Sequence, residues 1–187
     1  MQWTWIVLGI VALLIVGSIA LYNGLVARRQ RVRDAWANID TELRRRLDLI
    51  PNVVETVKGY ATHEREVFER VTQARAAAAD AASPAAAAAA DAVLTAALRQ
   101  LFAVAEAYPD LKANQNFLAL QAELSGTEDR IASSRARYNA AVRDLNEAVQ
   151  RFPAVLFASA LGFREESYFE VEAAVRDAGA PKVDFSA

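Results

Sequence analysis

Hydrophobic residues fill the start of the chain without interruption. Residues 3–22 contain no charged side chain. As a helix, twenty residues rise about 30 Å, which matches the hydrocarbon core of a bilayer. Trp3 and Trp5 lie at one end of this stretch and Tyr22 at the other, where aromatic rings favour the headgroup region. The pattern predicts a transmembrane helix and an N-terminal anchor over residues 1–22.

A cleaved signal peptide is the alternative interpretation, because Ser18-Ile19-Ala20 loosely fits a small-x-small cleavage site. Two features favour a retained anchor. The apolar stretch is longer than a typical signal core, and Met1-Gln2 supply no basic region before it. No cysteine follows the stretch, so a lipoprotein anchor is excluded.

After residue 22, apolar residues recur every three or four positions, which is typical of helices with one buried face. Pro51 interrupts the first of these helices, because it lacks an amide donor and restricts Ile50. The spacing leaves open whether Pro51 kinks one helix or marks a turn between two. Three further breaks are predicted, at Ser83-Pro84, Tyr108-Pro109-Asp110 and Phe152-Pro153.

These breaks define an all-α fold, and no strand pattern follows the anchor. With a turn at Pro51, which we favour, the second helix ends near Ala82, the third runs over 84–107 and the fourth over 112–151. We therefore expect an N-terminal transmembrane helix followed by an elongated antiparallel four-helix bundle over residues 23–152. Residues 153–187 form an apolar segment and a partly flexible C-terminal tail in this prediction.

The number of helices decides where the apolar segment 154–163 lies. It is too short to span a bilayer. Four antiparallel helices return the chain to the end of the bundle near the membrane, where this segment could enter the bilayer interface. If Pro51 only kinks a longer helix, the count is odd and the segment lies far from lipid.

Charge refines this picture. The chain has 21 basic and 23 acidic residues, a formal charge of −2, which argues against a general nucleic-acid binder. Four cations follow the anchor closely, and by the positive-inside rule they place the N-terminus outside and the C-terminal domain in the cytoplasm. Each also attracts anionic lipid by about 1 kcal/mol near the surface. These juxtamembrane arginines are Arg28, Arg29, Arg31 and Arg33.

A second basic run, Arg44-Arg45-Arg46, lies inside the predicted first helix. Its three side chains point in different directions around the helix. Snorkelling and ion pairing explain such a run without any ligand. The functional alternative is contact with phosphate groups or with an acidic partner.

Side chains and motifs typical of catalytic sites are scarce in the sequence. The single histidine, His63, begins a His-Glu-Arg-Glu sequence that lacks the second histidine of a zinc protease, and one histidine cannot supply a di-iron bundle. The absence of cysteine excludes thiolate sites, and no serine-hydrolase motif or glycine-rich phosphate loop is present. We predict no enzyme, no catalytic, cofactor-binding or metal-binding residues, and no cofactor. An enzyme using His63 with Glu64 or Glu66 is the minor alternative.

Several long segments stand out along nearly the whole chain. They include Tyr22-Asn23-Gly24-Leu25-Val26, Arg45 to Ala61 (RRLDLIPNVVETVKGYA), Ala105 to Asn114 (AEAYPDLKAN), Thr127 to Ala132 (TEDRIA), Arg137-Tyr138-Asn139 and Ala180 to Phe185 (APKVDF). In this order, the segments resemble the LemA family. The resemblance implies a bacterial membrane protein with an N-terminal anchor and an antiparallel helical bundle. The family has no established enzymatic activity, so the resemblance supplies no catalytic residues.

Within these segments we expect structural roles. Aromatic residues should pack together, and asparagines should cap helices or bridge between them. Gly126 either weakens the fourth helix or marks a close approach of two helices. The aromatic residues are Trp36, Tyr60, Tyr108, Phe117 and Tyr138, and the asparagines are Asn23, Asn52, Asn114 and Asn139.

Together these observations indicate a single-pass protein of the bacterial inner membrane that acts as a non-enzymatic scaffold or interaction module. Small residues give the anchor places for close packing, so a homo-oligomer is expected. An adaptor for other membrane proteins, such as proteases or quality-control factors, is the alternative. The small residues are Gly9, Ala12, Gly17 and Ala20.

Overall fold

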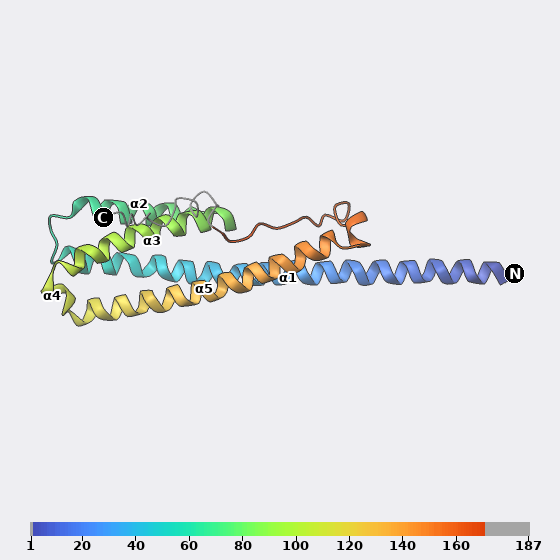
Figure 1. Cartoon of the computed structure of the whole chain (residues 1–187), viewed down its shortest axis with the longest axis horizontal. Coiled ribbons are helices and arrows are strands. Elements are labelled where there is room, and N and C mark those ends of the chain that lie inside the picture. Colours follow the sequence, from blue (N-terminus) through green and yellow to red (C-terminus); the bar gives the residue numbers. More distant parts are fainter. Residues whose placement is uncertain (1, 171–187) are drawn as a thin grey trace, which may run out of the picture. The chain divides into compact units, whose positions relative to one another are not determined.

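The computed structural model describes residues 2–170, and this part of the chain is all-helical, as expected (Figure 1). Four long helices, one short helix and a final 3-10 turn follow one another in order. They are α1 (Gln2–Lys58), α2 (Arg65–Ala79), α3 (Pro84–Glu106), α4 (Pro109–Lys112), α5 (Gln115–Gln150) and η1 (Ala154–Leu156). The part of the predicted C-terminal tail beyond residue 170, including residues 180–185, lies outside the described residues.

The preferred interpretation of Pro51 is wrong, because α1 passes through Pro51 without ending. Proline leaves the carbonyl four residues earlier, that of Leu47, without its helical amide donor. Arg75 of α2 supplies the missing donor, since its Nε lies 2.9 Å from the Leu47 oxygen. A side chain from the neighbouring helix thus satisfies the carbonyl that proline would otherwise leave unpaired.

The chain reverses later, over residues 59–64. The amides of Tyr60 and Ala61 both donate to the carbonyl of Val57, at 3.0 and 2.9 Å, and close the end of α1. The second helix is therefore much shorter than predicted. Between residues 2 and 170 four long helices still result, with the first turn placed after Lys58 instead of at Pro51. We also expected an odd number of helices if one helix continued through Pro51, and this expectation is wrong.

Two helix starts follow the expected capping chemistry. The Ser83 hydroxyl accepts a hydrogen bond of 3.2 Å from the amide of Ala86, and Pro84 takes the first position of α3. Asn114 caps α5, because its side-chain oxygen accepts from the amides of Asn116 and Phe117 at 2.9 and 3.1 Å. The break near Pro109 contains the short helix α4.

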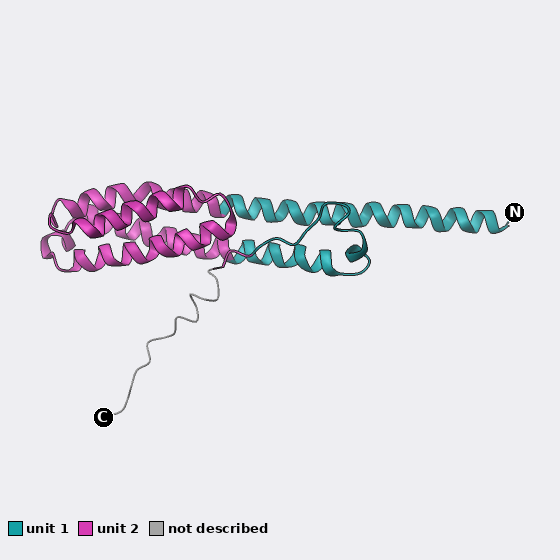
Figure 2. Ribbon diagram, turned by 90° about the horizontal axis from the view of Figure 1, so that it is seen from above, with its two compact units in different colours: residues 1–38, 136–167 teal, residues 39–135, 168–187 magenta. Residues whose placement is uncertain are grey.

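The chain divides into two compact units (Figure 2). Unit 1 contains residues 1–38 and 136–167, and unit 2 contains residues 39–135 and 168–187. Helices α1 and α5 each contribute to both units.

Unit 2 is built around the larger apolar core. The core joins the last two turns of α1 to one face each of α2, α3 and α5. Its members follow the helical spacing that the sequence predicts. They include Ile50, Val53, Val57, Phe68, Val71, Leu94, Leu98, Leu101, Phe117 and Leu124.

Unit 1 contains the apolar stretch of α1. Large apolar side chains between residues 3 and 19 are all between 45% and 80% exposed. The stretch is long and apolar enough to cross a membrane. Helix α3 also reaches that length and apolar character, but residues such as Leu94 and Leu101 bury it in the core of unit 2.

Candidate functional site

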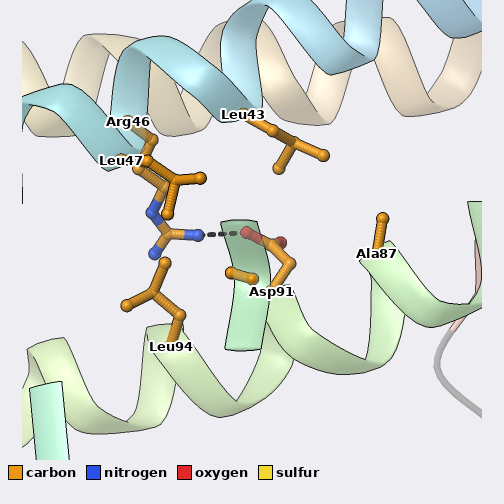
Figure 3. Close-up of a pocket in the computed structure, with 7 residues that line it drawn as sticks. Leu43, Arg46, Leu47, Ala87, Asp91 and Leu94 are labelled. Atoms are coloured by element: carbon orange, nitrogen blue, oxygen red, sulfur yellow. Dashed lines mark hydrogen bonds and ion pairs between the residues drawn. The ribbon is translucent and has the colours of Figure 1, made fainter. Parts of the chain in front are cut away.

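Arg46 is the most buried charged residue of unit 2, at 1% exposure. Its guanidinium forms an ion pair with Asp91 of α3, drawn in Figure 3, and Nη2 donates to Thr95 Oγ1 at 2.9 Å. Nη2 also lies 2.5 Å from Oε1 of Glu128 in α5. This arginine cluster, defined as Arg46, Asp91, Thr95 and Glu128, links three helices through one guanidinium.

Burial shapes the electrostatics of the arginine cluster. It raises the pKa of Glu128 above its usual value, and the nearby Arg46 charge partly opposes this effect. Nε of Arg46 makes no hydrogen bond within the described residues. A buried charge with so many partners is costly to leave unpaired, so the cluster fixes how α1, α3 and α5 meet in unit 2.

The cavity on the Asp91 side of the arginine cluster is small. Its volume is about 20 Å³, close to that of a single water molecule. Figure 3 shows Leu43, Leu47, Ala87 and Leu94 around the Arg46–Asp91 pair. This cavity has no room for an organic ligand, but a second, open groove of about 340 Å³ is lined by Arg46, Thr95 and Glu128 of the same cluster. The ion pairs of Arg46 with Asp91 and Glu128 account for the cluster as a contact that holds three helices together.

All three arginines of the run Arg44-Arg45-Arg46 pair with carboxylates of their own chain. Arg44 pairs with Asp40 one turn earlier, at 2.9 Å, and Arg45 pairs with Glu123 of α5, at 3.1 Å. Ion pairing therefore accounts for the run. A phosphate or an acidic partner is not needed to explain it.

Sequence reasoning missed the partners of Arg46. Asp91 carried a usable signal, because it is the only charge among the alanines of residues 85–92. It also lies at helical spacing between Ala87 and Leu94, both of which are buried. A lone carboxylate on an otherwise apolar face predicts a buried cation opposite. Glu128, one of many carboxylates that stand among polar neighbours in the sequence, gives no such signal.

His63 lies exposed in the turn before α2. Glu64 is the residue that precedes α2, and Glu66 lies exposed in its first turn. Across residues 2–170, no three histidine or carboxylate side chains are placed to hold a metal ion. His63 is therefore not part of such a metal-binding group in this range.

The juxtamembrane arginines make different contacts in unit 1. Arg28 and Arg31 both pair with Asp144 of α5, at 3.3 and 3.2 Å. Arg29 instead lies over the ring of Phe163, 4.6 Å from its centroid, in a cation–π contact. Arg33 is exposed.

An apolar loop follows α5 in the same unit, and we define it as residues 152–163. Its small residues Ala154 and Ala158, with Phe163, pack against Leu25, while Leu21 of α1 covers the same cluster. Its larger apolar residues remain exposed: Phe152, Val155, Leu156, Phe157 and Leu161. The loop thus lies against α1 where the uncharged stretch ends, and in Figure 2 both belong to the same unit.

The expected aromatic packing is found in part. Trp36 and Tyr138 meet edge to face in unit 1, with ring centroids 5.9 Å apart. Phe117 packs against Phe102 in unit 2, and there the Tyr60 hydroxyl accepts a hydrogen bond of 3.0 Å from Asn114.

The Tyr138 hydroxyl reaches a backbone partner in unit 1. It donates to the carbonyl of Ser167 at 2.9 Å. Asn146 holds the same backbone segment, because its side-chain amide forms two hydrogen bonds with the backbone of Glu166, of 3.0 and 2.9 Å. Burial, together with the charge of Glu166, raises the pKa of Tyr138 to about 12.

Comparisons with known proteins agree on one family. A sequence model of the LemA family matches residues 35–185. Magnetosome protein MamQ of Magnetospirillum gryphiswaldense is 26% identical, over 79% of this chain and 64% of that protein. Protein LemA of Metamycoplasma hominis is 27% identical, over 70% of this chain and 60% of that protein. The chain therefore spans somewhat less than two thirds of the length of these curated relatives.

Proposed function

Because the chain belongs to the LemA family, we propose that it is a single-pass protein of the bacterial inner membrane that acts as a non-enzymatic scaffold. In this proposal residues 3–22 span the bilayer and the helical bundle works by contact with other proteins. The magnetosome in the names of some relatives is not part of the proposal.

The observation that carries the proposal is the continuity of α1. One helix contains the exposed apolar stretch and, further along, side chains of the core of unit 2 such as Val53 and Val57. Exposing so many large apolar side chains to water is unfavourable, and a bilayer removes that cost. A cleaved signal peptide would not be expected to continue as the same helix into a folded core.

The orientation rests on charge. Arg28, Arg29, Arg31 and Arg33 follow the apolar stretch closely, and the positive-inside rule places them in the cytoplasm. The bundle then faces the cytoplasm as well. A reporter fused after Ala187 tests this directly: fluorescence of a cytoplasmic reporter is expected, and activity of a periplasmic alkaline phosphatase at the same position contradicts the orientation.

Self-association is supported by the surface of the apolar stretch. At both Gly9 and Gly17 a Cβ would meet nothing within 4 Å, so a second helix has room to approach closely. Photo-crosslinkers placed at Leu13 and Val16, next to these glycines, should capture a second copy of the chain in native membranes. Capture of lipid alone at both positions, with monomer mass in mild detergent, contradicts a homo-oligomeric scaffold.

An adaptor for other membrane proteins is the second candidate, favoured by a groove on unit 2. The groove has a volume of about 400 Å³ between α2 and α3 and is lined by Ala74, Ala77, Ala96 and Ala97. Val93 beside it is 60% exposed. A photo-crosslinker at Val93 distinguishes the candidates, because an adaptor captures a different polypeptide there and a scaffold of identical copies captures itself.

A further inference from the structure

We propose that the apolar loop, residues 152–163, is a second membrane contact that inserts into the headgroup region of the bilayer spanned by α1. The inference rests on the proposed transmembrane position of residues 3–22. It adds a lipid-binding surface that is separate in sequence from that anchor. The occupant to which we commit is the anionic bilayer surface.

The apolar loop exposes unusually large apolar side chains. Phe152 is 76% exposed, Leu156 63% and Phe157 55%, and Val155 and Leu161 add to the same short segment. Water is a poor solvent for such a cluster, since each large apolar side chain gains about 1.5–3 kcal/mol on full burial. Contiguous exposed apolar residues of this kind mark a binding surface.

The loop's own packing keeps these side chains facing outward. Ala154 and Ala158 are buried against the cluster that contains Leu25, and the amide of Ala158 donates to the carbonyl of Ala154 at 2.8 Å. Gly162 adopts a φ of +76°, which only glycine takes without strain, and closes the loop. Ala154, Ala158 and Phe163 therefore take the inner positions, and the other large residues of the loop are left on the outside.

Contacts with α1 set the depth of the loop relative to the bilayer. Phe163 meets Tyr22 edge to face, with centroids 5.6 Å apart, and the cluster reaches Leu21. Tyr22 is the last residue of the uncharged stretch. Whatever surrounds Tyr22 therefore also surrounds the loop. When residues 3–22 span the membrane, that surrounding is the boundary between headgroups and acyl chains.

The charges beside the loop fit an anionic surface. Arg151 precedes the loop and Arg164 follows it, while Arg29 lies over the Phe163 ring. Two carboxylates come next, Glu165 and Glu166. Glu165 accepts a hydrogen bond of 2.9 Å from Gln150. Apolar side chains flanked by arginines are typical of segments that lie in the interface of anionic membranes.

A groove beside the loop has the same mixed character. Its volume is about 200 Å³, and Ala20, Leu21 and Phe152 line it together with Arg28 and Arg151. Apolar walls with two arginines among them suit a lipid whose acyl chain and phosphate enter side by side. A second copy of the chain is the alternative occupant of the exposed residues. It would have to displace the lipid that surrounds the anchor at the depth of Tyr22.

Fluorescence quenching in vesicles tests the inference on the full chain. The chain has no cysteine, so single substitutions can each carry one environment-sensitive nitrobenzoxadiazole label. The test position is Phe157→Cys. Leu13→Cys reports on the anchor, and Ala140→Cys, exposed on α5 about 18 Å of helix before residue 152, serves as the matched control in unit 1. Vesicles contain phosphatidylethanolamine, phosphatidylglycerol and a lipid with a doxyl quencher at a chosen depth.

The expected result is strong quenching at Phe157→Cys by doxyl groups near the headgroups, severalfold above that at Ala140→Cys, and weaker quenching by deeper groups. Leu13→Cys should show the opposite depth preference. Quenching at Leu13→Cys without quenching at Phe157→Cys overturns the inference and leaves the anchor intact. Absence of quenching at Leu13→Cys overturns the proposed function and the inference with it.

A second copy of the chain gives a different signature. The label at Phe157→Cys would then emit as in an apolar environment but resist quenching by the lipids. Energy transfer between differently labelled chains would rise with the ratio of protein to lipid. That combination overturns the lipid contact.

Discussion

Nε of Arg75 donates a hydrogen bond of 2.9 Å to the carbonyl oxygen of Leu47, the oxygen that Pro51 deprives of its helical donor. Leu47 and Pro51 lie in α1 and Arg75 in α2, so the bond joins two helices of unit 2. It explains how α1 passes a proline and still packs Val53 and Val57 into the core on the far side.

The bond predicts a specific energetic coupling. Arg75→Met leaves the Leu47 carbonyl unpaired in a partly buried position, which should lower the free energy of unfolding by about 1–2 kcal/mol. In a Pro51→Ala background residue 51 regains its amide donor, so the same Arg75 substitution should cost less than half as much. Chemical unfolding of the full chain in detergent, followed by circular dichroism, measures both values.

Arg70→Met is the matched control for this cycle. Arg70 donates a hydrogen bond of 3.3 Å to the carbonyl oxygen of Glu66 in its own exposed helix turn, so its loss should change stability by less than about 0.5 kcal/mol. Equal costs for Arg75→Met with and without Pro51 would show that the two residues do not act through Leu47.

Replacing Arg46 should be far more costly. Arg46→Met leaves Asp91 without its buried cation, and breaking a buried pair in this way typically costs about 3–5 kcal/mol. The double substitution Arg46→Met and Asp91→Leu removes both charges and should recover at least half of the loss. Thermal unfolding of the three variants gives the comparison.

The exposed pair of Arg44 with Asp40 supplies the control for Arg46. Arg44→Met should change stability by less than about 1 kcal/mol, because water solvates both charges. A cost for Arg46→Met as small as that of Arg44→Met would contradict a structural role for the arginine cluster.

Tyr138 should make stability depend on alkaline pH. Its pKa is raised from 10 to about 12, chiefly by burial, so the folded protein keeps a proton that the unfolded chain loses. The stabilisation from Tyr138 is therefore complete below pH 10 and falls as the pH rises from 10 to 12. Phenolate absorbance of the wild type minus that of Tyr138→Phe should titrate near 12 in the folded state and near 10 in urea. A folded-state midpoint near 10 would contradict the buried hydroxyl.

Gly126→Ala should stabilise α5. A Cβ at this position would lie 3.5 Å from Nη1 of Arg130, an ordinary contact with a flexible side chain. The interpretation of Gly126 as a close approach of two helices is therefore not supported, and alanine should add about 0.5–1 kcal/mol. Gly162→Ala is the contrasting control, since its φ of +76° disfavours any side chain, and it should destabilise unit 1. The melting temperatures of both variants should move in opposite directions.

Local signals made part of this fold predictable. Ser83-Pro84 and Phe152-Pro153 marked helix ends that the structure also has, because capping and proline geometry act within a few residues. The prediction at Pro51 was wrong because the hydrogen-bond donor to the Leu47 carbonyl comes from another helix. The burial of Arg46 was hidden for the same reason, since its partners Asp91 and Glu128 lie on α3 and α5. Such pairing is a property of tertiary packing, which single-sequence periodicity does not contain.

The pairing of Arg28 with Asp144 forms later than the insertion of the anchor into the membrane, because the two residues are synthesised at different times. The two residues are 116 positions apart. At about 5–20 residues per second, a ribosome needs roughly 6–23 s to reach the aspartate after adding the arginine. In the proposed topology, the translocon orients the anchor before Asp144 has been synthesised. Asp144 therefore neutralises none of the four juxtamembrane arginines at that time. Asp144 pairs with Arg28 and Arg31 after the orientation of the anchor is fixed. It then neutralises part of the positive charge that determined this orientation.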